Sequence, residues 1–484
     1  MKQLKKHVNY MKRHTNKMKI YINKMKNIQD EILDYIKENN DFPKFDFLEY
    51  NTTNFPRKLK LIEIFHLIES IANNCYKYPN FYDKIEKLIL YFLDDIKEIF
   101  STNEIFDIFS SNKRILLFLF QEGIIKVNSH ILTKAKAMPS YYSYLKKAAI
   151  AQEEFEKYDK KRKIGENDCD ICRLIQNDSI VDFIKLVNQE NINLNSLIPE
   201  SIFETNPFLV DKRPTLIEYA AFFGSIQIIQ YMALNNVKLT SSLWIYSIHS
   251  NNPELINYLE SNDVKPPNNS YEECLIESIK CFWSDLTEYF NDNKQIDTFE
   301  LFKRTIQYHN YSIPFDFKDE NLYFYIKFDY PIFVYFYKCY LPSSSEYINR
   351  TIKDDGSLNE ETLLSIAVEG GYNEIVNILL SYDAIDVNQI LTNRKNNNYA
   401  YYEIIEKTAL SIAVHSGNRE MVQILLTRSN ADINLKISYK KSKFDYDEDD
   451  DELFLQHYSK EIDECYFTFY EDRHYYEINN ILMF

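Results

Sequence analysis

The sequence predicts an all-α protein in which a helical N-terminal region is followed by a degenerate stack of helix pairs, an α-solenoid. The stretch 362–388 reads as a helix, a turn, a second helix and an extended finger, and its residue types return in the same order from Thr408 to Asn434. Apolar residues also recur at helical spacing earlier in the chain. A self-similar helix pair cannot bury its apolar face alone, so the repetition implies stacked neighbours.

The placement of glycine supports this prediction. The chain contains only seven glycines, and three of them, Gly224, Gly371 and Gly417, occupy the turn between the two helices of a repeat. That turn needs a positive φ, which glycine adopts without steric cost. No GxGxxG or GxxxxGK[ST] motif can be assembled from so few glycines, so we predict no glycine-loop nucleotide site and no cofactor.

The composition excludes several classes of protein. The chain has 484 residues, of which 45% are hydrophobic and 15% aromatic, which is enough material for more than one core. A net charge of -16 disfavours general binding to nucleic acid, because phosphate contacts need a basic face. Seven cysteines with no secretory signal ahead of them favour a cytoplasmic location. No apolar run approaches the roughly 18 residues of a membrane span.

Residues 1–40 are predicted to form a basic helix. Residues 1–29 carry nine Lys or Arg and no acid, and Met18, Ile22 and Met25 fall on one side of the helix. A solvated or coiled-coil helix is the favoured interpretation. A helix on an anionic membrane surface, a transit peptide and a nucleic-acid contact remain as alternatives.

Residues 41–165 are predicted to form a helical N-terminal domain. Leu61, Ile64 and Leu67 have the spacing of one buried helix face, and similar segments follow. The basic cluster 160–163 ends this domain. It is interpreted as a solvated helix end that complements the helix dipole, with a nuclear address as the alternative.

Residues 166–350 are predicted to be degenerate helical repeats. Thr215 and Glu218 have the spacing of a capping box, in which the hydroxyl and the carboxylate each accept a backbone N–H. Ser247 and Ser278 each precede an isoleucine, as a small residue would where one helix pair packs closely on the next.

Residues 351–436 contain two clear repeats, which resemble ankyrin repeats. The ankyrin pattern reads T-P-L-H-x-A-A-x-x-G-x-x-x-x-V-x-x-L-L, followed by an extended D-V-N. The first copy matches at Thr362, Leu364, Ala367, Gly371, Val376, Leu379, Leu380, Asp386, Val387 and Asn388. The second copy matches at Thr408, Leu410, Ala413, Gly417, Val422, Leu425, Leu426, Asp432 and Asn434. Ser365 and Ser411 stand where the pattern has His, which removes the side chain that ties adjacent turns together.

The spacing of the two copies also departs from the family. It exceeds the roughly 33 residues of an ankyrin repeat, so the Asn- and Tyr-rich stretch 391–402 is predicted to be an inserted loop. Residues 437–484 are predicted to be an acidic and then aromatic C-terminal tail, in which 478–484 could cap the last helix pair.

A narrower resemblance covers about residues 150–435. It rests on the stretches 161–167, 201–206, 215–226, 243–246 and 252–254. These are similar to a large protozoan family whose members carry a helical domain of unknown function upstream of ankyrin repeats. The resemblance implies an interaction scaffold and supplies no catalytic residue.

Few patterns point to metal or catalytic chemistry. Cys169 and Cys172 form the only CxxC motif, and Cys274 and Cys281 lie two helical turns apart. A structural zinc site would need a second pair of ligands at matching spacing. These thiols are therefore interpreted as buried and apolar, and we predict neither a metal site nor a catalytic residue. The acidic run 445–452 lacks the glycine and the final glutamate of a calcium loop and is interpreted as a solvated linker.

Two pairs of residues stand out at the ends of the first helices of repeats. His249 and His415 occupy the same repeat position on the inner surface of the stack, where contact or exposure is favoured over catalysis. Phe222 and Phe223 form either an apolar binding patch or part of the core. Packing is favoured, because adjacent helical residues cannot point the same way.

We therefore expect non-catalytic binding of a protein partner on the concave face and fingers of the stack. The candidate contact residues are Glu369, Asp386, Asn388, His415, Ser416, Asp432 and Asn434, together with Phe222 and Phe223. The finger residues have the alternative role of stabilising their own turns. A membrane-surface adaptor that uses the basic helix is the second hypothesis. The third is an unrecognised enzyme in 41–165. The sequence there shows no pairing of a nucleophile with a base, and a lone His66 or Cys75 is more often a core residue than a catalytic one.

Overall fold

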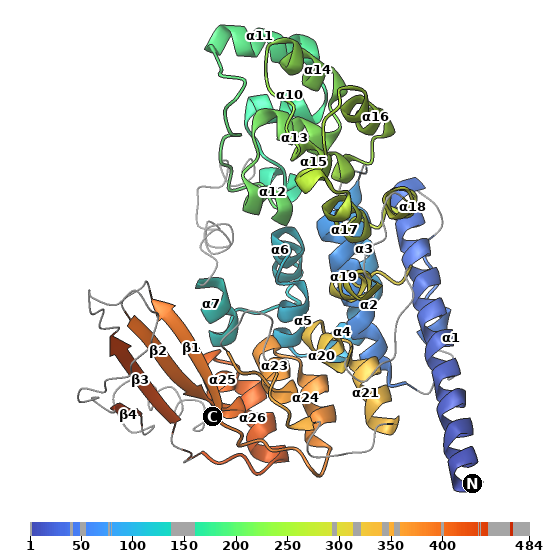
Figure 1. Cartoon of the computed structure of the whole chain (residues 1–484), viewed down its shortest axis with the longest axis vertical. Helices are drawn as coiled ribbons and strands as arrows, with labels where there is room; N and C mark the ends of the chain where they lie inside the picture. Colours follow the sequence, from blue (N-terminus) through green and yellow to red (C-terminus); the bar gives the residue numbers. More distant parts are fainter. Residues whose placement is uncertain are drawn as a thin grey trace, which may run out of the picture. The chain divides into compact units, whose positions relative to one another are not determined.

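The computed structural model describes residues 2–38, 42–48, 55–75, 78, 80–136, 160–292, 298–312, 321–340, 348–352, 359–397, 401–433, 435, 437–443 and 465–467. The chain divides into two compact units (Figure 1). Unit 1 comprises Met1–Lys126 and Ala135–Phe324, and unit 2 comprises Val127–Lys134 and Tyr325–Phe484. The predicted helical fold class is confirmed, since nearly all described elements are helices. No described helix is long and apolar enough to cross a membrane.

Unit 1 begins with a single long helix, α1 (Lys2–Glu38), where a basic helix was predicted. Its apolar side is buried against the rest of unit 1 at Met18, Tyr21, Met25, Ile28, Ile32 and Ile36. It packs on the helices α2 (Arg57–Asn74) and α3 (Phe81–Tyr91). The stripe that a membrane surface would need is therefore already covered over the second half of the helix.

The remaining N-terminal helices complete a bundle with an aromatic core. They are η1 (Asp46–Leu48), α4 (Leu93–Ile99), α5 (Thr102–Phe109) and α6 (Lys113–Gln121). The next helix, α7 (Ser129–Lys136), spans the boundary of the two units. Phe65 lies at the centre of this core, with its ring centroid 5.6 Å from that of Phe92 and 5.9 Å from that of Phe109. Such edge and tilted ring contacts add to the area that the rings bury.

The second half of unit 1 is a stack of short helix pairs. The pairs are α10 (Asp170–Gln176) with α11 (Ile180–Glu190), α13 (Leu216–Phe223) with α14 (Ile226–Leu234), α15 (Leu243–Ser250) with α16 (Pro253–Ser261), and α17 (Glu272–Lys280) with α18 (Ser284–Asp292), followed by α19 (Thr298–Gln307). The first helices α10, α13, α15, α17 and α19 contact one another in this order. Two shorter elements interrupt the series, α12 (Pro207–Lys212) and η2 (Pro267–Asn269).

One turn geometry recurs after the first helix of each pair. A residue with a left-handed backbone follows that helix at Asp178, Gly224, Asn251, Phe282, His309, Asp329, Gly371 and Gly417. After most of these turns, the next N–H donates back across them, as Ser225 does to the carbonyl of Ala220 and Trp283 to that of Ser278. Residues other than glycine adopt this conformation at a steric cost. Packing therefore maintains a turn that the sequence alone marks only at the glycines.

Unit 2 continues the same arrangement. It contains α20 (Leu322–Lys327), which starts at the boundary, α21 (Pro331–Tyr340), α23 (Leu363–Gly370), α24 (Asn373–Leu380), α25 (Ala409–His415) and α26 (Arg419–Arg428). Thr362 caps α23 by accepting the N–H of Ser365, and the Ser365 hydroxyl accepts the N–H of Thr362. Ser411 does the same for Thr408. The serines that replace the family histidine thus close capping boxes within their own repeats.

Unit 2 also contains a sheet that was not predicted. Its strands β1 (Leu391–Asn397), β2 (Tyr401–Lys407), β3 (Ile437–Lys443) and β4 (Cys465–Phe467) pair antiparallel in this order. The stretch 391–402, predicted to be an inserted loop, instead supplies β1 and the start of β2, and two strands arise from the predicted tail. Strand stability comes from distant partners, which composition does not reveal. The predictions for 445–452 and 478–484 lie outside the described residues.

Candidate functional site

The first helices of the repeats end in one structurally equivalent place. We define the pre-turn position as the residue two places before the left-handed turn residue. Its occupants in unit 1 are Gln176, Phe222, His249, Lys280 and Gln307, and in unit 2 they are Lys327, Glu369 and His415. The predicted equivalence of His249 and His415 is therefore confirmed by the turn geometry, and three of the nine candidate contact residues, Phe222, Glu369 and His415, also occupy the pre-turn position.

In unit 2 the pre-turn position faces solvent in the two clear repeats. Glu369 and His415 are both exposed, and they end the neighbouring helices α23 and α25, which contact each other. Ser416 is half-buried, and its hydroxyl donates to the carbonyl of Ala413. Glu369 and His415 thus offer an acid and an imidazole on adjacent repeats.

The fingers of unit 2 are joined by an asparagine ladder, formed by Asn349 and Asn388. The Asn349 side chain accepts the N–H of Asp386 at 2.8 Å and donates to the carbonyl of Ala384 at 2.7 Å. In the next finger, Asn388 accepts the N–H of Asp432 at 2.7 Å and donates to the carbonyl of Asn430. Each asparagine therefore ties its finger to the following one.

This ladder divides the predicted finger residues by role. The amide of Asn388 is used within the stack, as the turn-stabilising alternative expected. The side chains of Asp386 and Asp432 are exposed, and Asp386 also accepts the N–H of Asn388 at 3.0 Å. Asn434 lies outside the described residues. Asn349 escaped the sequence analysis because its repeat has lost the residues that identify the other two.

Phe222 and Phe223 have different environments in unit 1. Phe222 is buried, and its ring stacks on those of Phe208 and His249 at centroid distances of 6.0 and 4.9 Å. Phe223 is half-buried against Tyr219. Since α12 places Phe208 over this pair, Phe222 belongs to the core, which contradicts its use as a partner contact.

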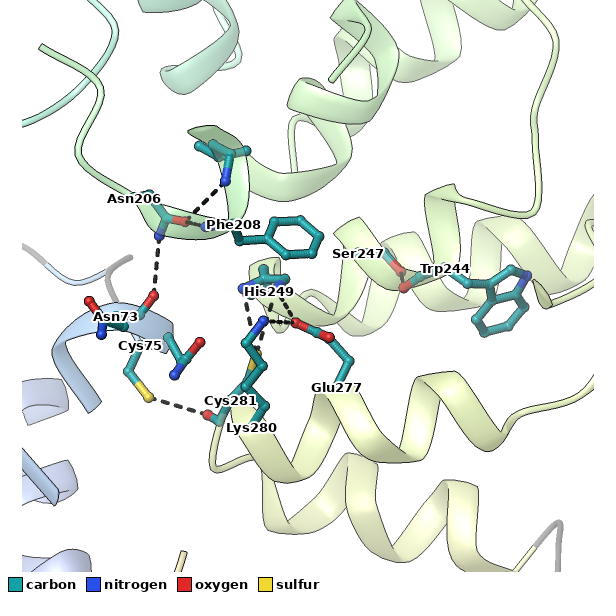
Figure 2. A network of polar contacts seen from close by, with 12 residues as sticks. Asn73, Cys75, Asn206, Phe208, Trp244, Ser247, His249, Glu277, Lys280 and Cys281 are labelled. Carbon is teal, nitrogen blue, oxygen red and sulfur yellow. Dashed lines mark hydrogen bonds and ion pairs between the residues drawn. The ribbon is translucent and has the colours of Figure 1, made fainter. Parts of the chain in front are cut away.

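His249 lies inside unit 1, in contrast to His415. Its Nε2 is 2.7 Å from Glu277 Oε1, an atom that also accepts a hydrogen bond from the Lys280 ammonium at 2.9 Å (Figure 2). Its Nδ1 is 3.5 Å from the Cys281 thiol. The Cys281 carbonyl in turn accepts a hydrogen bond from the thiol of Cys75 at the end of α2.

Burial determines the charges of this cluster. It lowers the pKa of His249, despite the neighbouring carboxylate, and raises that of the Cys281 thiol well above its usual value. Burial alone would also raise the pKa of Glu277, but the His249 hydrogen bond and the Lys280 ammonium lower it to about 2. At neutral pH the cluster therefore holds a neutral imidazole, a thiol and one buried ion pair.

The turns of the unit 1 stack are covered by the N-terminal helices. On α2, Ser70 donates to the carbonyl of Tyr308, and the Asn73 carbonyl accepts a hydrogen bond from Asn206. Glu63 is fully buried and accepts hydrogen bonds from the Tyr21 and Tyr311 hydroxyls. These contacts cover the turn side of the stack in unit 1. In unit 2, by contrast, the pre-turn residues Glu369 and His415 are exposed.

The cysteines of the CxxC motif and of α17 and its cap are mostly buried, as predicted, and Cys274 and Cys281 are both fully enclosed. Cys172 is buried, and Cys169 is half-buried with a pKa that burial raises. Within the described part of the chain, the group of residues able to surround an ion is instead His249, Glu277 and Cys281. No short motif signals it, because the histidine and the other two residues come from different repeats.

Comparison with known proteins identifies the C-terminal repeats. Residues 337–437 match the family model of ankyrin repeats, in three copies. No curated protein matches the chain. The matched range begins before the two repeats predicted from the sequence, and Asn349 lies in this earlier part. The chain therefore contains ankyrin repeats at residues 337–437.

Proposed function

We propose that this protein is a non-catalytic interaction scaffold, which binds a protein partner on the inner-helix ends and fingers of its C-terminal ankyrin repeats. The carrying observation is that the pre-turn position is exposed at Glu369 and His415 but lined with core contacts at Phe222 and His249. A solenoid binds through surface positions that vary between repeats, while its packing residues stay the same.

The fingers narrow the proposed contact surface further. The side-chain amide of Asn388 forms the hydrogen bonds of the asparagine ladder. The side chains of Asp386 and Asp432, in contrast, are exposed on the fingers that the ladder aligns. We therefore place the contact on Glu369, His415, Asp386 and Asp432. A rigid row of fingers lowers the entropy that binding would otherwise cost.

The proposal also covers the family of the protein and its location in the cell, as expected from the sequence. The order of a helical block followed by ankyrin repeats supports kinship with the protozoan scaffold family. The degenerate stack of unit 1 shares the turn geometry of the matched repeats, which supports a common repeat origin. We assign the protein to the cytoplasm, with the nucleus as the alternative, on the strength of its cysteine content.

The double variant Glu369→Lys with His415→Glu tests the surface. Proximity labelling in the native cell would be compared between the wild-type chain and this variant. Proteins that bind the pre-turn surface should lose their enrichment in the variant, because the two substitutions change the side-chain chemistry of both exposed positions.

A matched control carries Asp182→Lys with Lys185→Glu on the outer helix α11, where both side chains are exposed in an ion pair. The control should retain the labelled set. Equal labelling by the pre-turn variant and the wild-type chain, with both folded by circular dichroism, would refute the proposed surface.

A further inference from the structure

We infer that His249, Glu277 and Cys281 form a binding site for a divalent transition-metal ion inside unit 1, and that the chemistry of its ligands selects zinc. The three residues offer nitrogen, oxygen and sulfur, which together are the donor set of zinc in proteins. The expectation of no metal site rested on short sequence motifs, which do not detect ligands that two neighbouring repeats bring together.

The three ligand atoms lie close to the arrangement that they would have around a bound ion. All three atoms lie within 4.8 Å of one another. His249 Nε2 is 2.7 Å from Glu277 Oε1 and 4.0 Å from Cys281 Sγ. Zinc bonds of about 2.0–2.3 Å in a tetrahedron separate two ligand atoms by roughly 3.3–3.6 Å. The pair that is farthest apart, at up to 4.8 Å, must therefore approach by about 1.2 Å, which small rotations of the two side chains can supply.

The surrounding fold holds the ligands in place without an ion. Glu277 and Cys281 are one helical turn apart, on the last turn of α17 and its cap, and therefore lie on one face. The His249 ring is fixed by the rings of Phe208 and Phe222, at centroid distances of 4.2 and 4.9 Å. A ligand set arranged in this way loses little conformational entropy when the ion binds.

Binding would exchange a proton for the ion. A cysteine is ordinarily a thiol at neutral pH, so Zn²⁺ displaces the proton of Cys281 to solvent and forms a bond to the thiolate sulfur. The thiolate and the Glu277 carboxylate together balance the two positive charges of the ion. Three protein ligands leave a fourth position for water, as in many zinc sites.

Lys280 is the natural competitor for this site. Its ammonium donates to Glu277 Oε1, the atom that the ion needs. The Lys280 side chain is also the most exposed part of the cluster, at 19% of its surface, so it can turn to solvent and leave a path for the ion. A purely structural network would need Lys280 for stability, whereas a metal site would bind more tightly without it.

Cobalt titration of the full-length chain tests the inference. The protein is stripped with a chelator and titrated with Co²⁺, which reports a bound thiolate by a sulfur-to-metal charge-transfer band. We expect one Co²⁺ per chain with this band, release of one proton per ion, and displacement by Zn²⁺. Weak binding to surface carboxylates would give no such band.

Matched variants separate the site from a general effect on folding. Cys281→Ser should lose the band, and Cys274→Ser should keep it, because Cys274 is equally buried on the same helix but lies outside the cluster. Lys280→Met should bind Co²⁺ several-fold more tightly than the wild-type chain. Helical circular dichroism confirms folding of each variant.

Three results would overturn the inference. They are a folded wild-type chain that shows no thiolate band, a band that survives in Cys281→Ser, and a band lost in Cys274→Ser as in Cys281→Ser. A Lys280→Met chain that binds Co²⁺ no more tightly than the wild-type chain would also count against the site, since removal of the competing ammonium should increase the affinity for the ion.

Discussion

His249 and His415 occupy the same place in two repeats of one chain and have opposite environments. In unit 1, α12 and α17 enclose the histidine with Phe208, Glu277 and Cys281. In unit 2, His415 is exposed at the end of α25. The comparison teaches that a repeat position has no fixed function. What packs on the turn decides whether its side chain becomes core or surface.

The two stacks have diverged in line with this difference. In unit 1 the N-terminal helices bond to the turns, through Ser70 to Tyr308 and Cys75 to Cys281. Two of these turns carry the buried residues Phe282 and His309 in place of glycine, because packing offsets the backbone cost. The two clear repeats of unit 2 keep glycine at Gly371 and Gly417, as unit 1 does at Gly224. The N-terminal helices thus contact turns that no longer carry the glycine of the repeat.

The largest effect expected is at the buried pre-turn position. Phe222→Ala should lower the free energy of unfolding by about 3–5 kcal/mol, because it removes a fully packed ring and leaves a cavity. Glu369→Ala, at the equivalent exposed place, should change it by less than about 0.5 kcal/mol. Chemical denaturation measures both. Similar losses at the two positions would break the distinction between the stacks.

A pH dependence of intermediate size is expected from unit 1. Burial raises the pKa of Glu204 to about 7, above its usual value of 4.5, and its second oxygen has no hydrogen-bond partner. The folded chain then holds a proton that the unfolded chain releases. This contribution is complete below pH 4.5 and is lost as the pH rises through 7, since ionisation of the buried group is unfavourable.

Glu204→Gln should remove this dependence. The variant keeps an acceptor for the N–H of Asn206 but cannot ionise. At pH 8 we expect the free energy of unfolding of the variant to be about 1–3 kcal/mol larger than that of the wild-type chain. At pH 5 we expect little difference between the two. Parallel stability curves across this range would show that Glu204 is not protonated in the folded chain.

The smallest effect is expected in the fingers of unit 2. Asn388→Ala should cost about 1 kcal/mol, because two hydrogen bonds are lost at a half-exposed site where water can replace them. Hydrogen exchange should become faster at the backbone amide of Asp432, which donates a hydrogen bond to Asn388. It should remain unchanged at the backbone amide of Asp386, which donates to Asn349. Faster exchange at both amides would mean that the fingers loosen together.

The repeats of unit 2 were predictable because their signals are local. The threonine caps at Thr362 and Thr408, and the glycines that end their first helices, appear in the sequence as they do in the fold. The same reasoning identified the capping box of Thr215 and Glu218. It missed the sheet, because the pairing of β2 with β3 joins two fingers that are separated by a helix pair.

The sequence by itself determined the helices, their caps and the repeated turns, because capping and helical spacing depend on residues within a few positions of one another. Only the tertiary structure decided which equivalent positions are buried. The exposure of His415, the enclosure of His249 and the approach of His249 to Glu277 and Cys281 depend on what packs against each turn. Such contacts join residues from separate helices, and no local pattern specifies them.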